Sequence, residues 1–136
     1  MPKFTIDVNV VLAWMELQSP ELCRPAGRFF QKMRRGEEIL FAPEFLLVEL
    51  TNVLKWRYKR DERESGELIK RTRDSGIRFV AIGSGKVEEI NKLVHKYGLT
   101  SYDALYLFVA QKMECKLVTT DPKLLEVKEW CEGLGK

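Results

Sequence analysis

The chain has 136 residues, which suits one domain able to bury roughly two-thirds of its unfolded surface. Its 45% hydrophobic and 32% charged residues argue against disorder. Its net charge of +3 permits an anionic partner without requiring one. No apolar run approaches the roughly 18 residues of a membrane span. We expect a cytoplasmic protein. Its cysteines Cys23, Cys115 and Cys131 form no C-x-x-C pair, so we expect reduced thiols. His95 is the only histidine, so any metal should be held by oxygen.

The first half of the chain alternates strand and helix signals. Residue patterns predict, in chain order, a strand at 3–6 that ends at Asp7, a buried helix at 8–17, an amphipathic helix from Pro20 that stops at Gly36, a strand at 39–42, and a long helix from Pro43 to about residue 59. On the long helix, Glu49 interrupts an apolar stripe of Leu46, Val53 and Trp56. Burying an unpaired carboxylate is costly, so Glu49 needs either a structural salt bridge or a functional partner.

The second half continues the alternation. Its patterns predict a charged helix at 61–73 that ends near Gly76, a strand at 78–82, a turn at 83–85, a helix at 86–97 capped by Gly98, a buried helix from Thr100 to Met113, a strand at 116–119, and a final piece at 122–130 that is a short helix or a helix followed by a strand. Strands that alternate with helices predict an α/β fold in which a parallel sheet is covered on both faces. The chain contains no repeat, low-complexity tract or linker, so we expect a single domain over residues 1–136.

Four acids occupy comparable places in this arrangement. Asp7 follows the first strand, Glu49 lies in an early turn of the helix after the second, Asp103 lies in the first turn of the buried helix, and Asp121 follows the strand at 116–119. Taken singly, Asp7 and Asp121 can be N-caps, and Asp103 can complement a helix dipole. A parallel α/β sheet gathers the carboxyl ends of its strands at one crevice, which favours a site where all four meet.

A carboxylate cluster of this kind predicts a bound cation. Close like charges repel and raise one another's pKa unless a cation neutralises them, and Mg²⁺ or Mn²⁺ prefers carboxylate and water ligands. Such clusters are suited to phosphodiester hydrolysis, because the ion activates water and offsets charge on the phosphate. Asn9, Thr119 and Thr120 lie beside the acids in the sequence and can hydrogen-bond a ligand, although turn and strand roles explain them equally well.

These residues resemble a known family. The strand ending in Asp7, the segment VELTNVL with Glu49, the helix YDALYLFVA with Asp103 and the segment LVTTD ending in Asp121 are similar to PIN-domain proteins, specifically small VapC-type toxins and their archaeal relatives. The resemblance implies a three-layer α/β/α fold, Mg²⁺ or Mn²⁺ bound by these acids, cleavage of single-stranded RNA, and dimerisation. Asn9 departs from the pattern, since many relatives have Ser or Thr at this position.

Basic residues supply a candidate RNA-binding surface. Lys55, Arg57, Lys59 and Arg60, together with Lys32, Arg34 and Arg35, can form a rim that guides RNA phosphates to the acids, and the alternative is a solvated helix face. We therefore interpret the chain as a metal-dependent endoribonuclease, the toxin of a toxin–antitoxin pair with a small antitoxin partner. Two other functions stay open: an inactive nucleic-acid-binding module of the same fold, and a small phosphatase or phosphotransfer protein.

Overall fold

Parallel strands form the central sheet of the protein, whose computed structural model describes residues 1–135. In chain order the elements are β1 (Lys3–Ile6), α1 (Val8–Trp14), α2 (Pro20–Arg34), β2 (Ile39–Pro43), α3 (Phe45–Trp56), α4 (Glu62–Arg73), β3 (Arg78–Val80), the 3₁₀ turn η1 (Ser84–Lys86), α5 (Val87–Tyr97), α6 (Ser101–Lys112), β4 (Lys116–Thr119), α7 (Pro122–Leu125) and β5 (Cys131–Gly133). The strand order is β3-β2-β1-β4-β5, and every neighbouring pair is parallel. All carboxyl ends of the strands therefore lie at one edge of the sheet.

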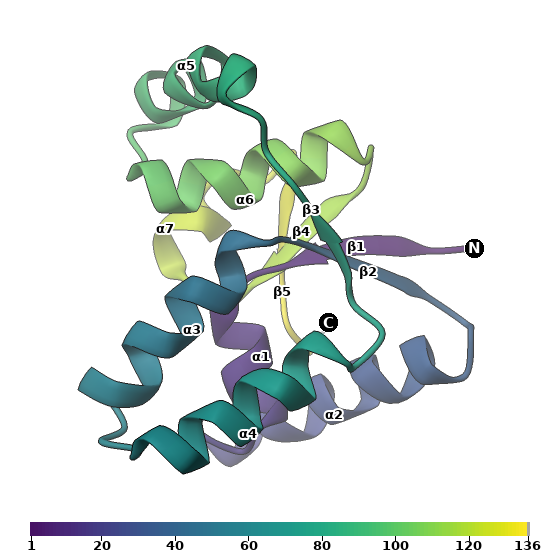
Figure 1. The fold of residues 1–136 in the computed structure, drawn as a ribbon. Helices are drawn as coiled ribbons and strands as arrows, with labels where there is room; N and C mark the ends of the chain where they lie inside the picture. The colour runs from purple at the N-terminus through teal and green to yellow at the C-terminus, as the bar shows by residue number, and fades with distance from the viewer. Residues whose placement is uncertain (136) are drawn as a thin grey trace.

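Helices cover both faces of the sheet, which confirms the predicted three-layer α/β/α fold (Figure 1). The α5 and α6 helices lie on one face, and α1, α2 and α4 lie on the other. The α6 helix packs against β1, β2 and β4, which explains why its residues from Tyr106 to Ala110 are all buried. No helix within residues 1–135 has the length and apolar character that crossing a membrane requires.

The α1 helix ends earlier than its apolar pattern predicted. It stops at Trp14 rather than at residue 17, because Glu16 adopts a φ of 64°, a left-handed conformation that a right-handed helix cannot include. The Leu17 N–H then donates back to the Leu12 carbonyl at 2.9 Å. The short helix stays in place because the Trp14 ring stacks on Phe30 of α2, with centroids 4.2 Å apart.

The start of α3 and its buried face also differ from the prediction. Pro43 is the last residue of β2, and the helix begins at Phe45 rather than at the proline. Its buried residues recur every four positions, at Leu46, Leu50 and Leu54, whereas Trp56 of the predicted stripe is 62% exposed. The predicted stripe was right for Leu46, which is fully buried, and for Val53, which packs against the core, but wrong for Trp56, because α3 packs mainly against α4 along one side.

The remaining boundaries shift by a few residues. The β3 strand ends at Val80 instead of residue 82, and the predicted turn at 83–85 is largely the 3₁₀ turn η1. The final piece is a helix followed by a strand, but β5 begins at Cys131, just beyond the predicted limit. This strand pairs with β4, with Thr119 opposite Gly133, and so extends the sheet beside the end of β4.

Candidate active site

Local structure explains how each of the four acids reaches the carboxyl edge of the sheet. Asp7 follows β1 and caps α1, and Asp121 follows β4 and caps α7, with Pro122 as the first helical residue. Asp103 lies in the first turn of α6, and Glu49 lies on the second turn of α3. Because β1 and β4 are adjacent parallel strands, their two terminal aspartates end side by side at the same edge.

Asp7 is the most deeply buried acid. Its side chain accepts the Val10 N–H on Oδ1 at 3.2 Å, and the Thr119 hydroxyl donates to Oδ2. The residue is only 4% exposed, and this burial, with the charges of Glu49 and Asp103, raises the pKa of Asp7 from 3.8 to about 7 despite both hydrogen bonds. A carboxyl group with this pKa releases its proton readily when a cation approaches.

Thr119 joins the two strand-end aspartates. Besides donating to Asp7, its Oγ1 accepts the backbone N–H of Asp121 at 3.0 Å. The Asp121 carboxylate in turn accepts the Lys123 N–H at 3.0 Å as the cap of α7. One buried hydroxyl thus fixes the carboxylate of Asp7 relative to the backbone of Asp121.

Glu49 is half-buried and hydrogen-bonded to a tyrosine. The Tyr106 hydroxyl donates to Glu49 Oε1 at 2.6 Å. Burial raises the pKa of Glu49, and the charge of Asp103 raises it further, whereas the Tyr106 bond and the charge of Arg57 act in the opposite direction. Burial and the adjacent Glu49 also raise the pKa of Tyr106, so its hydroxyl stays protonated and acts as a donor.

Asp103 is electrostatically coupled to each of the other three acids. Its backbone N–H donates to the hydroxyl of Thr100, the N-cap of α6, at 3.2 Å. Burial raises the pKa of the Asp103 carboxyl and the charge of Asp121 adds to the effect, although Thr100 and Lys123 partly offset both. Asp103 also raises the pKa of Asp7 and Glu49, so the four carboxyl groups form one electrostatically coupled group.

The chemistry of this group suits a hard divalent cation. All four donors are carboxylates, and their mutual repulsion is the kind that a cation relieves. Within residues 1–135, no three histidine, cysteine, aspartate or glutamate side chains lie close enough together to hold a metal ion jointly. Mg²⁺ commonly keeps several water ligands and is bound directly by only one or two carboxylates, so one or two of these acids together with water would suit Mg²⁺ or Mn²⁺.

The neighbouring polar residues divide into two groups. Thr119, predicted beside the acids, does bond to Asp7, whereas Asn9 and Thr120 are half-buried and take no part in the hydrogen bonds just described. Sequence reasoning missed Tyr106, which it counted as part of an apolar helix. The feature of the sequence that could have identified Tyr106 is its position three residues after Asp103, which places both side chains on one side of α6.

The basic residues predicted at the end of α3 differ in the groups that they contact. Arg57, just after α3, is close enough to Glu49 to affect its pKa, whereas the Nζ atoms of Lys55 and Lys59 lie 4.7 Å and 5.9 Å from the centre of the Trp56 ring. Arg60 forms an ion pair with the carboxylate of Glu64 at 3.4 Å.

The second basic group lies away from the acids. Lys32, Arg34 and Arg35 are at the end of α2, shortly before β2 begins, and therefore at the amino edge of the sheet. The acids lie at the carboxyl edge. The structure thus does not bring these three residues to the rim, because α2 returns the chain to the start of the next parallel strand.

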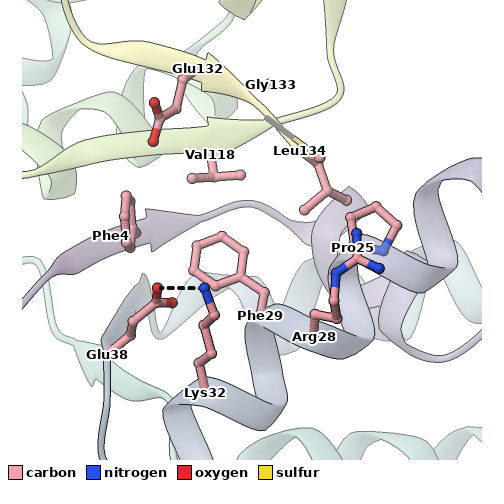
Figure 2. A pocket seen from close by; sticks show the side chains of 11 residues that line it. Phe4, Pro25, Arg28, Phe29, Lys32, Glu38, Val118, Glu132, Gly133 and Leu134 are labelled. Atoms are coloured by element: carbon pink, nitrogen blue, oxygen red, sulfur yellow. Dashed lines mark ion pairs between the residues drawn. The ribbon is translucent and has the colours of Figure 1, made fainter.

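A hollow of about 190 Å³ lies on the α2 side of the sheet, and Figure 2 shows the residues around it. It is bordered by Phe29 and Lys32 of α2 and by Val118 of β4, and Lys32 pairs with Glu38 at 3.9 Å. Val118 and Thr119 are consecutive in a strand, so their side chains point to opposite faces of the sheet. The hollow is therefore separate from the acids.

Comparisons with known proteins agree with this architecture. A family model described as PIN domain matches residues 4–129. The structure of PAE2754 from Pyrobaculum aerophilum superposes with a TM-score of 0.67 at 20% identity, covering 98% of this chain and 91% of that one. The structure of VapBC2 from Rickettsia felis bound to a DNA fragment from their promoter superposes with a TM-score of 0.66 at 13% identity, covering 96% of this chain and 98% of that one. No curated protein sequence matches the chain.

Proposed function

The chain belongs to the PIN-domain family, whose members are generally nucleases, and we propose that it is an endoribonuclease that depends on Mg²⁺ or Mn²⁺ and hydrolyses phosphodiester bonds of single-stranded RNA. The observation that carries the proposal is the coupled group of four carboxyl groups at the carboxyl edge of the sheet. In this proposal residues 1–136 act as one nuclease domain.

Each acid has a defined part in the proposed reaction. Asp7, Glu49, Asp103 and Asp121 would surround the cation, with one or two of them as direct ligands and the others reaching it through its water ligands. When bound, the cation supplies an activated water and offsets the charge that develops on the phosphate. Asp7 gives up its proton on loading, because burial keeps much of it protonated near neutral pH. Thr119 keeps Asp7 oriented, and we keep Asn9 and Thr120 as proposed neighbours of the bound water.

RNA reaches the acids across the basic residues that follow Glu49. Lys55, Arg57 and Lys59 are exposed at the end of α3, where their charges can contact phosphates, and Arg60 contributes less because Glu64 already pairs with it. Arg57 is the member closest to the acids in electrostatic terms. An RNA substrate also agrees with a cytoplasmic location, as do the free thiols of Cys23, Cys115 and Cys131.

A toxin–antitoxin setting completes the proposal. The sequence resembles VapC-type toxins, and the fold resembles VapBC2, which was crystallised on promoter DNA. We therefore propose that a small antitoxin protein binds this chain. A neighbouring reading frame for a small DNA-binding protein, and copurification of the two products, would test this partner.

We also propose a homodimer. The α3 helix exposes Val48 at 60% and Trp56 at 62%, and the adjacent Tyr102 is 57% exposed while its ring stacks on Phe45. Apolar side chains grouped in this way favour a protein interface. We expect the wild type to have the mass of a dimer in light scattering, and Val48→Glu to have that of a monomer.

The central test is RNA digestion with Mn²⁺ and with chelator. We expect Asp7→Asn, Glu49→Gln, Asp103→Asn and Asp121→Asn each to remove most of the metal-dependent cleavage while circular dichroism stays unchanged. Asp74→Asn, an exposed acid outside the group, is the matched control and should cleave normally. Wild-type cleavage by Asp103→Asn would contradict the proposal.

The two other functions predict different results in the same assay. An inactive binding module binds RNA but cleaves none in any metal. A phosphatase releases phosphate from a small phosphomonoester and leaves internal RNA bonds intact.

A further inference from the structure

Tyr106 places a hydroxyl group among the acids, on a helix that is otherwise apolar. The residue lies on α6 and is 2% exposed, so its ring is held by the core. Its hydroxyl donates to Glu49 Oε1 at 2.6 Å, across 57 residues of sequence. This bond links the helix that carries Asp103 to the helix that carries Glu49.

The bond constrains the most flexible of the four acids. A glutamate has one more rotatable bond than an aspartate, and Glu49 lies on a half-buried helix face rather than at a strand end. Asp7 and Asp121 are restrained because they cap helices, and Asp103 is attached to the first turn of α6. Tyr106 supplies the corresponding restraint for Glu49, because it engages Oε1 and leaves Oε2 available.

We propose that Tyr106 is a positioning residue, which holds the Glu49 carboxylate in the conformation that binds a divalent cation. The inference rests on the proposed function, since it assumes that Glu49 is a ligand. A tyrosine suits this role because its packed ring loses little freedom when the hydroxyl donates. Residues that orient metal ligands typically change metal affinity by about 10- to 100-fold when they are replaced.

A structural role for the same bond predicts something different. If the hydroxyl only satisfies a half-buried carboxylate, its removal lowers the melting temperature but leaves Mn²⁺ affinity as it was. If it positions Glu49, Mn²⁺ affinity falls. The dissociation constant for Mn²⁺ in the absence of RNA therefore separates the two roles without any measurement of cleavage.

The test compares Tyr106→Phe with Tyr102→Phe in the full chain. Tyr102 is on the same helix beside Asp103 but is 57% exposed, so its variant controls for the loss of a hydroxyl near the site. Electron paramagnetic resonance measures the free Mn²⁺ in each titration and so gives the Mn²⁺ dissociation constant. We expect Tyr106→Phe to bind Mn²⁺ at least about tenfold more weakly than wild type, and Tyr102→Phe to bind it within about twofold of wild type.

A double variant tests whether Tyr106 acts through Glu49. In a Glu49→Gln background, Tyr106→Phe should cause no further loss of Mn²⁺ affinity. A second full loss in that background would overturn the inference, and so would wild-type affinity in the single Tyr106→Phe variant.

A measurement on the unmutated protein covers the case in which Tyr106→Phe does not fold. With tyrosine labelled at the ¹³Cζ atom, Mg²⁺ should shift the Tyr106 signal and leave that of Tyr97, whose hydroxyl bonds to Glu129, unchanged. If the chemical shift of Tyr106 does not change at saturating Mg²⁺, the positioning role alone is overturned. A wild type that binds neither ion would overturn the metal site and the role of Tyr106 together.

Discussion

Replacing Asp7 by asparagine should stabilise the metal-free protein at alkaline pH. Burial raises the pKa of Asp7 from 3.8 to about 7, so the folded state holds a proton that the unfolded state releases. Stability therefore falls as pH rises from roughly 4 through about 7, and the loss is complete above that range. Asparagine carries no proton to lose, and it remains a good N-cap for α1.

The size of the effect follows from the two pKa values. A folded pKa of about 7 against an ordinary value of 3.8 corresponds to roughly 4 kcal/mol, at about 1.36 kcal/mol per pKa unit. Asparagine keeps an acceptor for the Val10 N–H, but its amide is a poorer partner than a carboxylate for the Thr119 hydroxyl. We therefore expect Asp7→Asn to raise the unfolding free energy at alkaline pH by about 2–4 kcal/mol. For a domain of this size that is on the order of ten degrees in melting temperature.

The assay is urea unfolding in chelator at pH 4.5 and pH 8, for wild type, Asp7→Asn and Asp61→Asn. Asp61 is a matched control because it caps α4 and accepts the Glu64 N–H at 2.8 Å, but it is exposed. The unfolding free energies of both variants should be close to that of wild type at pH 4.5. At pH 8, only Asp7→Asn should have a higher unfolding free energy than wild type. Mn²⁺ at about a hundred times its dissociation constant should add roughly 2.7 kcal/mol to wild type and less to Asp7→Asn. Equal stability of wild type and Asp7→Asn at pH 8 without metal would refute the reasoning.

Further substitutions test three other parts of the structure. Thr119→Val removes the hydroxyl that joins the two strand-end aspartates, so it should lower the unfolding free energy by about 1–3 kcal/mol and weaken Mn²⁺ binding. Thr120→Val should change the unfolding free energy little, and equal losses of unfolding free energy in the two variants would contradict the bridging role of Thr119. Lys55→Gln and Lys59→Gln should each reduce the salt dependence of RNA binding by about one unit of slope, and an unchanged slope would mark both as solvated charges. Burial raises the pKa of Glu38, so Glu38 should add to the loss of wild-type stability with rising pH. Glu38→Gln should cleave RNA normally and lose less stability than wild type between pH 4.5 and pH 8, because the contribution of Asp7 remains; a loss as large as that of wild type would rule out a contribution from Glu38.

Much of the candidate site could be predicted from local sequence. A β-prone run followed by Asp7 or Asp121 indicates a strand end and a helix start, and Thr100 before the buried α6 indicates where Asp103 lies. Alternation of strands and helices then implies a parallel sheet, whose strand ends meet at one edge. These inferences succeed because capping and strand termination depend on neighbouring residues alone.

Tertiary structure decided which side chains meet. The hydroxyl of Thr119 reaches Asp7 across 112 residues and that of Tyr106 reaches Glu49 across 57, and no local pattern records either contact. The buried face of α3 was predicted only in part, since Leu46 is buried but Trp56 is exposed, because several faces of that helix carry apolar residues and packing against α4 selects one. The pKa of Asp7 likewise depends on burial by distant segments. Local sequence therefore placed the acids on their elements, and the packing of those elements determined their partners and their charge.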